Sequence, residues 1–191
     1  MSRCLLVALC LLALAPLPSS AATTITSPEA IVDDARPKVF LAGSIEMGRA
    51  GDWQQEVQDA LADLDVVLLN PRRADWNPEW RPEADEPEFR RQVEWELDAM
   101  ERADLVLMYF APGTQSPITL LEFGLYARSG KLLLAAPVGY FRKGNLDITA
   151  ERYAVPRYET LPALINAVRA RVPRERSLLR PDTAGPARSA D

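Results

Sequence analysis

Short apolar runs alternate along the chain with longer segments in which apolar residues recur every three or four positions. Four of the runs, KVFLAGS, DVVLLNP, DLVLMYF and KLLLAAP, begin at Lys38, Asp65, Asp104 and Lys131. They are largely apolar, which is typical of strands buried on both faces of a sheet. A further run, YAVPRYE from Tyr153, is a candidate short strand. This alternation predicts an α/β domain with a small doubly wound, flavodoxin-like fold, in which a parallel five-stranded sheet carries helices on both faces.

The segments with helical spacing are residues 52–64, 88–103, 116–130 and 161–172. Each is expected to bury one apolar face against the sheet. In the second segment, four apolar side chains share a face that we expect to be buried, namely Phe89, Val93, Leu97 and Met100. Residues 72–87 contain repeated prolines and predict a long loop.

Ligands in doubly wound folds bind beyond the carboxyl ends of the strands. Here those ends carry Gly43 and Ser44, Asn70 and Pro71, and the loop of residues 111–116. A small residue such as Gly43 allows backbone to approach a ligand closely. We therefore expect Gly43 and Ser44 to line a binding site.

A carboxylate interrupts the apolar stripe of the helix that follows the third strand. Ser116 is expected at the N-cap of this helix and Pro117 at its first position. The neighbours of Glu122 three and four positions away are Ile118, Thr119, Leu125 and Tyr126. A carboxyl group among them would be partly desolvated and would resist ionisation. Glu122 therefore either lies at the edge of the stripe and reaches water or an arginine, or serves as a reactive group in the crevice.

Two other segments offer candidate site residues. WELDAMERAD carries Glu96 and Asp98, which form either a solvated helix face or a second carboxylate of the site. The NPRRADW loop carries Asp75 and Trp76. The ring of Trp76 would either stack on a flat base or sugar or pin the long loop to the surface.

The composition narrows the possible chemistry. The chain has no histidine, which excludes Ser-His and Cys-His nucleophile pairs and removes the commonest metal ligand. Acid–base chemistry near neutral pH then depends on carboxylates, tyrosine or lysine. The net charge of −5 makes a nucleic-acid polymer an unlikely partner, because phosphate backbones are held by clustered basic side chains. We expect no metal and no cofactor.

The ends of the chain differ from the central domain, residues 38–172. Residues 1–22, MSRCLLVALCLLALAPLPSSAA, have the order of a secretory signal peptide: an arginine, an apolar run, then small residues. They predict a secreted or periplasmic protein with no membrane segment after cleavage. Both cysteines lie in this segment, so the mature chain would have no disulfide. Residues 23–37 are expected to be a flexible lead-in, and residues 173–191 a disordered tail.

Four stretches, FLAGSIEMG, NPRRADW, WELDAMERADLVLMYF and SPITLLEFGLYA, resemble the nucleoside 2-deoxyribosyltransferase-like family in order and spacing, from about Lys38 to Val172. The resemblance implies that Glu122 is a nucleophile that attacks the anomeric carbon of a nucleoside or nucleotide and forms a glycosyl ester. It places the second acid, which positions or protonates the leaving base, at Glu96, with Asp98 as a less suitable alternative. It also implies a homo-oligomer.

The resemblance leaves the substrate open. Deoxynucleoside-monophosphate hydrolases related to this family carry a serine at the position of Ser116 and the GSI sequence found here at Gly43, Ser44 and Ile45, which favours a phosphate-bearing substrate. Those hydrolases continue with an arginine, whereas this chain has Glu46, and a carboxylate repels a phosphate. Transfer and hydrolysis both remain open. So do a non-catalytic nucleotide-binding module and an exported enzyme that acts on a dinucleotide such as NAD.

Overall fold

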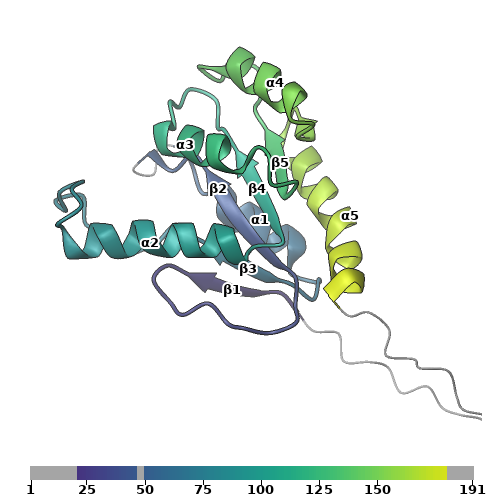
Figure 1. The fold of residues 1–191 in the computed structure, drawn as a ribbon, viewed down its shortest axis with the longest axis horizontal. Coiled ribbons are helices and arrows are strands. Elements are labelled where there is room, and N and C mark those ends of the chain that lie inside the picture. Colours follow the sequence, from purple (N-terminus) through teal and green to yellow (C-terminus); the bar gives the residue numbers. More distant parts are fainter. Residues whose placement is uncertain (1–20, 47–49, 180–191) are drawn as a thin grey trace, which may run out of the picture.

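The computed structural model describes residues 21–46 and 50–179, the last seven of them as backbone only. A six-stranded parallel sheet with the strand order β1-β3-β2-β4-β5-β6 carries helices on both faces (Figure 1). The strands are β1 (Thr23–Thr26), β2 (Lys38–Gly43), β3 (Val67–Asn70), β4 (Leu105–Tyr109), β5 (Leu132–Ala135) and β6 (Arg157–Tyr158). The helices are α1 (Trp53–Leu61), α2 (Pro87–Arg102), α3 (Pro117–Tyr126), α4 (Lys143–Arg152) and α5 (Leu161–Leu179).

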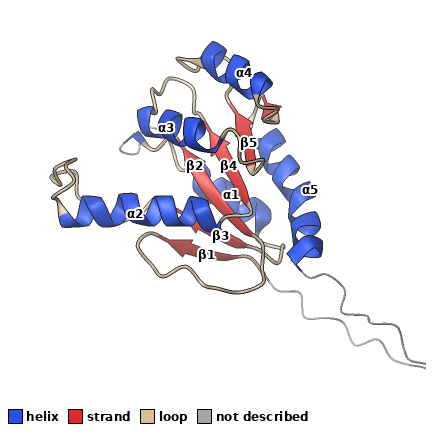
Figure 2. Ribbon diagram, in the orientation of Figure 1, coloured by secondary structure: helices blue, strands red, loops and turns tan. Residues whose placement is uncertain are grey.

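The hydrophobic core forms two layers, one on each face of the sheet. Buried side chains of α2, α3 and α4 pack on one face, and those of α1 and α5 pack on the other. Figure 2 shows the strands enclosed between these helices. Alternate residues of β4 contribute to the two layers, since Val106 and Met108 point towards α2 and α3 while Leu105 and Leu107 point towards α1 and α5. Burial on both faces explains why the central strands are apolar without alternation.

The doubly wound class predicted from the sequence is confirmed, and all five predicted strands are present as β2 to β6. Among these five the spatial order places β2 between β3 and β4. The chain therefore leaves β2 towards one edge of the sheet and returns through α2 to the other side of β2. The carboxyl ends of β2 and β4 flank this reversal, which is the place where doubly wound folds bind ligands.

The expected number of strands and the expected lead-in need correction. Residues 23–26, within the segment expected to be a flexible lead-in, form β1 and pair in parallel with β3. Only Ile25 of this strand is buried, because β1 lies at the edge of the sheet. A strand exposed on most of its surface has no apolar run, and its main sequence signal is the β-branched composition of TTIT.

Two helices also differ from expectation. The helix α5 continues past Val172 to Leu179, into the segment expected to be a disordered tail. The helix α4 was not predicted, since residues 143–152 have a weak apolar stripe with only Leu146 and Ala150 buried. The expected signal peptide is residues 1–22, of which residues 1–20 lie outside the described part of the chain. Residues 180–191, the end of the expected tail, also lie outside it. Within the described part, no helix is both long and apolar enough to cross a membrane.

The buried face of α2 was predicted incorrectly. The side chains that face the sheet are Gln92, Trp95, Ala99 and Met100. Of the four apolar residues expected to be buried only Met100 is, while Phe89 is partly buried and Val93 and Leu97 are exposed. The helix has two faces with apolar character, and the choice between them is made by contacts with β1, β2 and the segments around them.

Candidate active site

Three buried hydroxyl groups meet at the carboxyl ends of β2 and β4. The Ser44 Oγ lies 2.9 Å from the Thr114 Oγ1 and 2.5 Å from the Ser116 Oγ, and the last two atoms are 3.0 Å apart. The backbone N–H of Ala111 donates to the Ser44 Oγ at 3.0 Å, and the Thr114 hydroxyl donates to the Ala111 carbonyl at 2.7 Å. These bonds hold the loop after β4 against the end of β2. We call the Ser44, Thr114 and Ser116 hydroxyls the hydroxyl cluster.

Gly43 permits this close approach of the two strands. Its φ of +152° is unfavourable for residues with a side chain. A Cβ at this position would overlap the Tyr109 carbonyl oxygen and would lie 2.7 Å from a ring carbon of Trp53. Gly43 was expected to let backbone approach a ligand, and the structure shows that it makes room for the backbone of β4 and for the Trp53 ring.

The start of α3 is arranged differently from the expected serine cap. Ser116 occupies the N-cap position and Pro117 the first turn, but the Ser116 hydroxyl belongs to the hydroxyl cluster and does not cap the helix. The Glu46 Oε1 accepts the backbone N–H of Ser116 at 2.8 Å and also the N–H of Gln115, the two residues that precede the first helical position. Tyr140 supports the same loop by donating its hydroxyl to the Gln115 carbonyl at 2.8 Å.

Glu122 is buried on the inward face of α3. Its side chain is 8% exposed, and it shares this face with Thr119 and Phe123. Of the other neighbours expected to surround it, Tyr126 is half-buried against the core, whereas Ile118 is 60% and Leu125 58% exposed. The carboxylate therefore lies at the centre of the buried face, and the apolar stripe of α3 faces outwards.

Glu96 projects from α2 towards the same region and is held by a chain of hydrogen bonds. The Ser27 hydroxyl donates to the Gln92 Oε1 at 2.6 Å. The Gln92 Nε2 donates to the Glu96 Oε1 and to the Pro71 carbonyl, both at 2.8 Å. Gln92 lies one helical turn before Glu96 on the inward face, so a polar residue at this spacing was an available signal that the sequence analysis did not use. The alternative acid, Asp98, is exposed.

Burial and mutual repulsion shift the ionisation of the two carboxyl groups. Burial raises the pKa of Glu122 to about 8, with a smaller contribution from the negative charge of Glu96. Burial also raises the pKa of Glu96, and the hydrogen bond from Gln92 partly offsets this effect. Both shifts favour the protonated forms and disfavour two negative charges in this region.

Asp75 and Trp76 form a separate cluster on the loop before α2. The buried Arg73 guanidinium donates two hydrogen bonds to the Asp75 carboxylate, with N–O distances of 2.6 and 2.7 Å. The same guanidinium lies 4.9 Å from the centre of the Trp80 ring. Trp76 packs edge-on against Trp80 and Phe89, with ring centres 5.2 and 6.5 Å apart. Of the two roles considered for Trp76, these contacts support that of pinning the loop. The side-chain contacts of this pair are with Arg73, Trp80 and Phe89.

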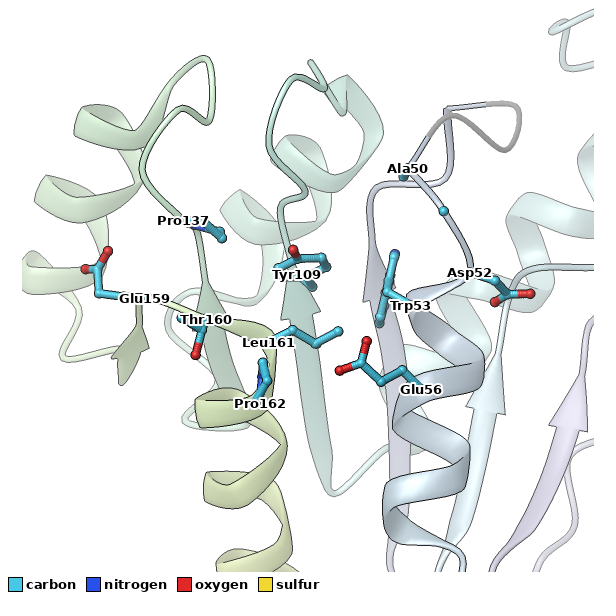
Figure 3. Close-up of a pocket in the computed structure, with 11 residues that line it drawn as sticks. Ala50, Asp52, Trp53, Glu56, Tyr109, Pro137, Glu159, Thr160, Leu161 and Pro162 are labelled. Atoms are coloured by element: carbon cyan, nitrogen blue, oxygen red, sulfur yellow. The ribbon is translucent and has the colours of Figure 1, made fainter.

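A cavity of about 500 Å³ lies on the opposite side of the strand ends (Figure 3). Trp53 and Glu56 of α1 line one side, Thr160 and Leu161 at the start of α5 line the other, and Tyr109 lies between them. The cavity contains neither Glu96 nor Glu122. It is connected to the site through Trp53, whose indole N–H donates to the Ser44 carbonyl at 2.8 Å.

Comparison with known families adds a decisive observation. A family model described as nucleoside 2-deoxyribosyltransferase-like matches residues 36–140, more than half of the 191-residue chain. The chain belongs to the nucleoside 2-deoxyribosyltransferase-like family. A comparison with curated proteins found no match. The membership inferred from the four sequence stretches is thus confirmed, and it is consistent with an enzyme of glycosyl transfer acting on a small nucleoside-like molecule.

The part of the chain that matches the family model runs from the segment before β2 to Tyr140. It contains the hydroxyl cluster, Glu96 and Glu122. The helices α4 and α5 and the strand β6 lie beyond it. Within the described residues, no group of three or more histidine, cysteine or acidic side chains is placed to hold a metal ion. The acidic pair and the hydroxyl cluster are the groups from which a function can be argued.

Proposed function

We propose that the protein cleaves or transfers the N-glycosidic bond of a nucleoside or nucleotide through an ester between the sugar and Glu122. The observation that carries this proposal is the pair of carboxyl groups formed by the buried Glu122 and the half-buried Glu96, whose pKa values are both raised. Such a pair holds one proton over an intermediate pH range, so that one member is a carboxylate and the other an acid. A retaining glycosyl transfer uses the form in which Glu122 is the carboxylate and Glu96 is the acid. Because burial favours the proton on Glu122 at pH 7, the reaction proceeds through the fraction of molecules in which the proton is on Glu96.

The proposed reaction has two steps. A Glu122 oxygen bonds to C1′ of the sugar while the C1′–N bond breaks, and the bonding electron pair leaves with the base, which takes a proton from Glu96. Water or a nitrogen of a second base then bonds to C1′, the ester C–O bond breaks, and Glu96 accepts the released proton. Attack by water gives hydrolysis, and attack by a second base gives transfer. Export, if it occurs, favours hydrolysis, because an exported protein rarely meets a second pool of free bases.

The test is incubation of the protein with 2′-deoxynucleosides, their 5′-monophosphates and NAD, with and without free adenine, followed by chromatography. Release of free base supports hydrolysis, and formation of a new nucleoside with adenine supports transfer. Release of nicotinamide alone would indicate an enzyme that acts on a dinucleotide. Binding of these compounds without any product would contradict the proposal and identify a non-catalytic binding module.

The raised pKa values predict a bell-shaped pH dependence of kcat/KM. At low pH both Glu96 and Glu122 are protonated, so no nucleophile is present. Above about pH 8, where the pair loses its last proton, no acid remains to protonate the leaving base. We expect a maximum between these limits, with the alkaline limb near pH 8 and the acidic limb above the usual glutamate range. A series of kcat/KM measurements from pH 4 to 10 checks this shape.

Glu96→Gln provides the control for this interpretation. It removes both the acid and the charge that raises the pKa of Glu122, so the alkaline fall is expected to disappear. The remaining activity should rise with pH, with a midpoint below the alkaline limb of the wild type near pH 8. Burial is the larger cause of the shift, so the midpoint should stay above the usual glutamate value. An unchanged bell in this variant would contradict the assignment of Glu96.

We also propose that two copies of the chain associate through the outward faces of α2 and α3. The exposed apolar side chains on these faces are Val93, Leu97, Ile118, Leu121 and Leu125. Figure 1 shows both helices on the same face of the sheet. This apolar surface adjoins the site, because Leu97 follows Glu96 and Leu121 precedes Glu122. An exposed apolar patch of this kind is typical of a protein interface.

Ile118→Asp is expected to lower the mass of the particle to that of one chain, because a charge in an apolar contact is desolvated without a partner. Light scattering after size exclusion measures this mass. Ile148→Asp is the matched control, since Ile148 is another exposed apolar residue, but on α4. It should leave the mass unchanged. A wild-type particle of one chain would contradict the proposed association.

A further inference from the structure

Gln92 carries a buried amide that joins three segments of the structure. It lies on the inward face of α2 and is 5% exposed. Its Oε1 accepts the Ser27 hydroxyl at 2.6 Å. Its Nε2 donates to the Pro71 carbonyl and to the Glu96 Oε1, both at 2.8 Å. Both N–H groups and the carbonyl oxygen of the amide are thus engaged, and a buried polar group whose bonds are all made is held in one orientation.

The neighbours of this amide determine which way round it lies. The Pro71 carbonyl accepts hydrogen bonds and donates none, so the nitrogen of Gln92 has to face it. A reversed amide would place its oxygen against this carbonyl. The Ser27 hydroxyl, on a side chain that is 3% exposed, donates to the amide oxygen on the other side. The contacts therefore set one direction of donation, from Ser27 to Gln92 and from Gln92 to Glu96.

The two anchors of Gln92 follow strands whose carboxyl ends lie side by side. Ser27 follows the last residue of β1, and Pro71 follows the last residue of β3. These strands pair in parallel with Thr26 opposite Asn70, and the Ser27 N–H donates to the Asn70 carbonyl at 3.0 Å. The strand β1 precedes the part of the chain that matches the family model. A segment outside the matched part thus reaches Glu96 through one glutamine.

The hydrogen bond from Gln92 makes the two oxygens of Glu96 unequal. In a protonated carboxyl group, the oxygen that accepts an N–H group is the carbonyl oxygen, because an O–H at that oxygen would meet the N–H. The proton of Glu96 is therefore carried by its Oε2. The same bond partly offsets the rise in the pKa of Glu96 that burial causes. The titratable group that faces Glu96 from α3 is Glu122, whose pKa the charge of Glu96 raises.

We propose that Gln92 is a positioning residue that fixes the Glu96 carboxyl group with its Oε2 towards the leaving base, and that Ser27 keeps Gln92 in place. This inference rests on the acid role proposed for Glu96 in base release. In that step the Oε2–H bond of Glu96 breaks while an N–H bond forms on the leaving base. Ser27 and Gln92 act through Glu96 and need no contact with the substrate.

The test compares two substrates that differ in their need for an acid. The base of 2′-deoxyguanosine takes a proton when it leaves, whereas the base of 7-methyl-2′-deoxyguanosine carries a positive charge and leaves as a neutral molecule. Base release is measured by chromatography, and the rate without protein is subtracted. Gln92→Met replaces the amide with an unbranched apolar side chain. It should lower kcat/KM for 2′-deoxyguanosine by about tenfold to a hundredfold and leave that for the methylated compound nearly unchanged.

Ser27→Ala is a milder variant, because it keeps Gln92 and removes only the hydroxyl that donates to it. It should lower kcat/KM for 2′-deoxyguanosine by about threefold to tenfold and spare the methylated compound. Trp95→Phe is the matched control. The Trp95 indole N–H donates to the Glu29 carbonyl at 2.7 Å, so this change removes another attachment of the same segment to α2 and leaves Gln92 intact. It should not alter the ratio of the two kcat/KM values.

Equal losses on both substrates in the Gln92 and Ser27 variants would indicate a purely structural role and would overturn the inference, as would unchanged rates. A second readout needs no turnover. Carbon NMR of protein labelled at the glutamate carboxyl groups, with the Glu96 signal assigned through Glu96→Gln, follows the titration of Glu96. Gln92→Met should raise the pKa of Glu96, because the hydrogen bond from Gln92 lowers it, and an unchanged pKa would contradict the proposed contact. If the wild type releases neither base, the proposed function fails, and the titration alone decides whether Gln92 holds Glu96.

Discussion

Glu122→Gln is expected to lower the rate of base release by at least about a thousandfold. An amide cannot form the glycosyl ester, although it nearly matches the carboxyl group in size and hydrogen-bonding capacity. The rate is measured by chromatography of the released base under the conditions that are optimal for the wild type. Intact-protein mass spectrometry should detect the glycosyl ester on the wild type during turnover and not on the variant.

The fold should survive this substitution. Because burial raises the pKa of Glu122 in the folded state to about 8, the side chain is largely protonated and neutral at pH 7. The associated stability is present below the pKa of the unfolded chain and is lost as pH rises through the folded value. Glu122→Gln lacks this ionisation, so its melting temperature should match the wild type near pH 5 and exceed it at pH 9.

Glu94→Gln is the control for this prediction, because it removes a carboxylate that is 61% exposed and ion-paired on the surface of α2. It should retain the wild-type rate and stability. Base release at an undiminished rate in Glu122→Gln would reject Glu122 as the nucleophile. An ester found on another residue would lead to the same conclusion and would identify the group that replaces it.

Gly43→Ala is expected to destabilise the folded protein by about 3 kcal/mol or more. The added methyl group would overlap the Tyr109 carbonyl oxygen and crowd the Trp53 ring. The Tyr109 carbonyl oxygen belongs to the backbone of β4 and cannot rotate away as the end of a flexible side chain can. The strands β2 and β4 would therefore have to separate near the hydroxyl cluster. Denaturant unfolding measures the change in the free energy of unfolding.

Gly144→Ala is the matched control, since Gly144 lies in α4 with open space around the added methyl group. Alanine is the better helix former, so the free energy of unfolding should stay the same or rise by up to about 1 kcal/mol. Equal stability of the two variants would show that the close approach at Gly43 is unimportant for the fold.

The roles of Glu122 and Glu96 stay predictions, and the reason given for the burial of Glu122 holds only in part, since Thr119 and Tyr126 are buried or half-buried and the other two expected neighbours are not. The helix pattern suggested that apolar neighbours such as Ile118 and Leu125 desolvate the carboxylate. Those side chains are exposed, and the inward face of α3 carries Thr119 and Phe123 with Glu122. A helix with apolar residues on several sides does not reveal from its sequence which side meets the sheet.

Local patterns in the sequence determined the central strands, four of the helices and the family, because these depend on periodicity and on motifs within short segments. Only the tertiary structure decided contacts between distant segments. Glu46 meets the start of α3 some 70 positions later, and β1 joins the sheet edge beside β3. Such contacts follow from how the strands are ordered in the sheet, and no local pattern along the chain encodes that order.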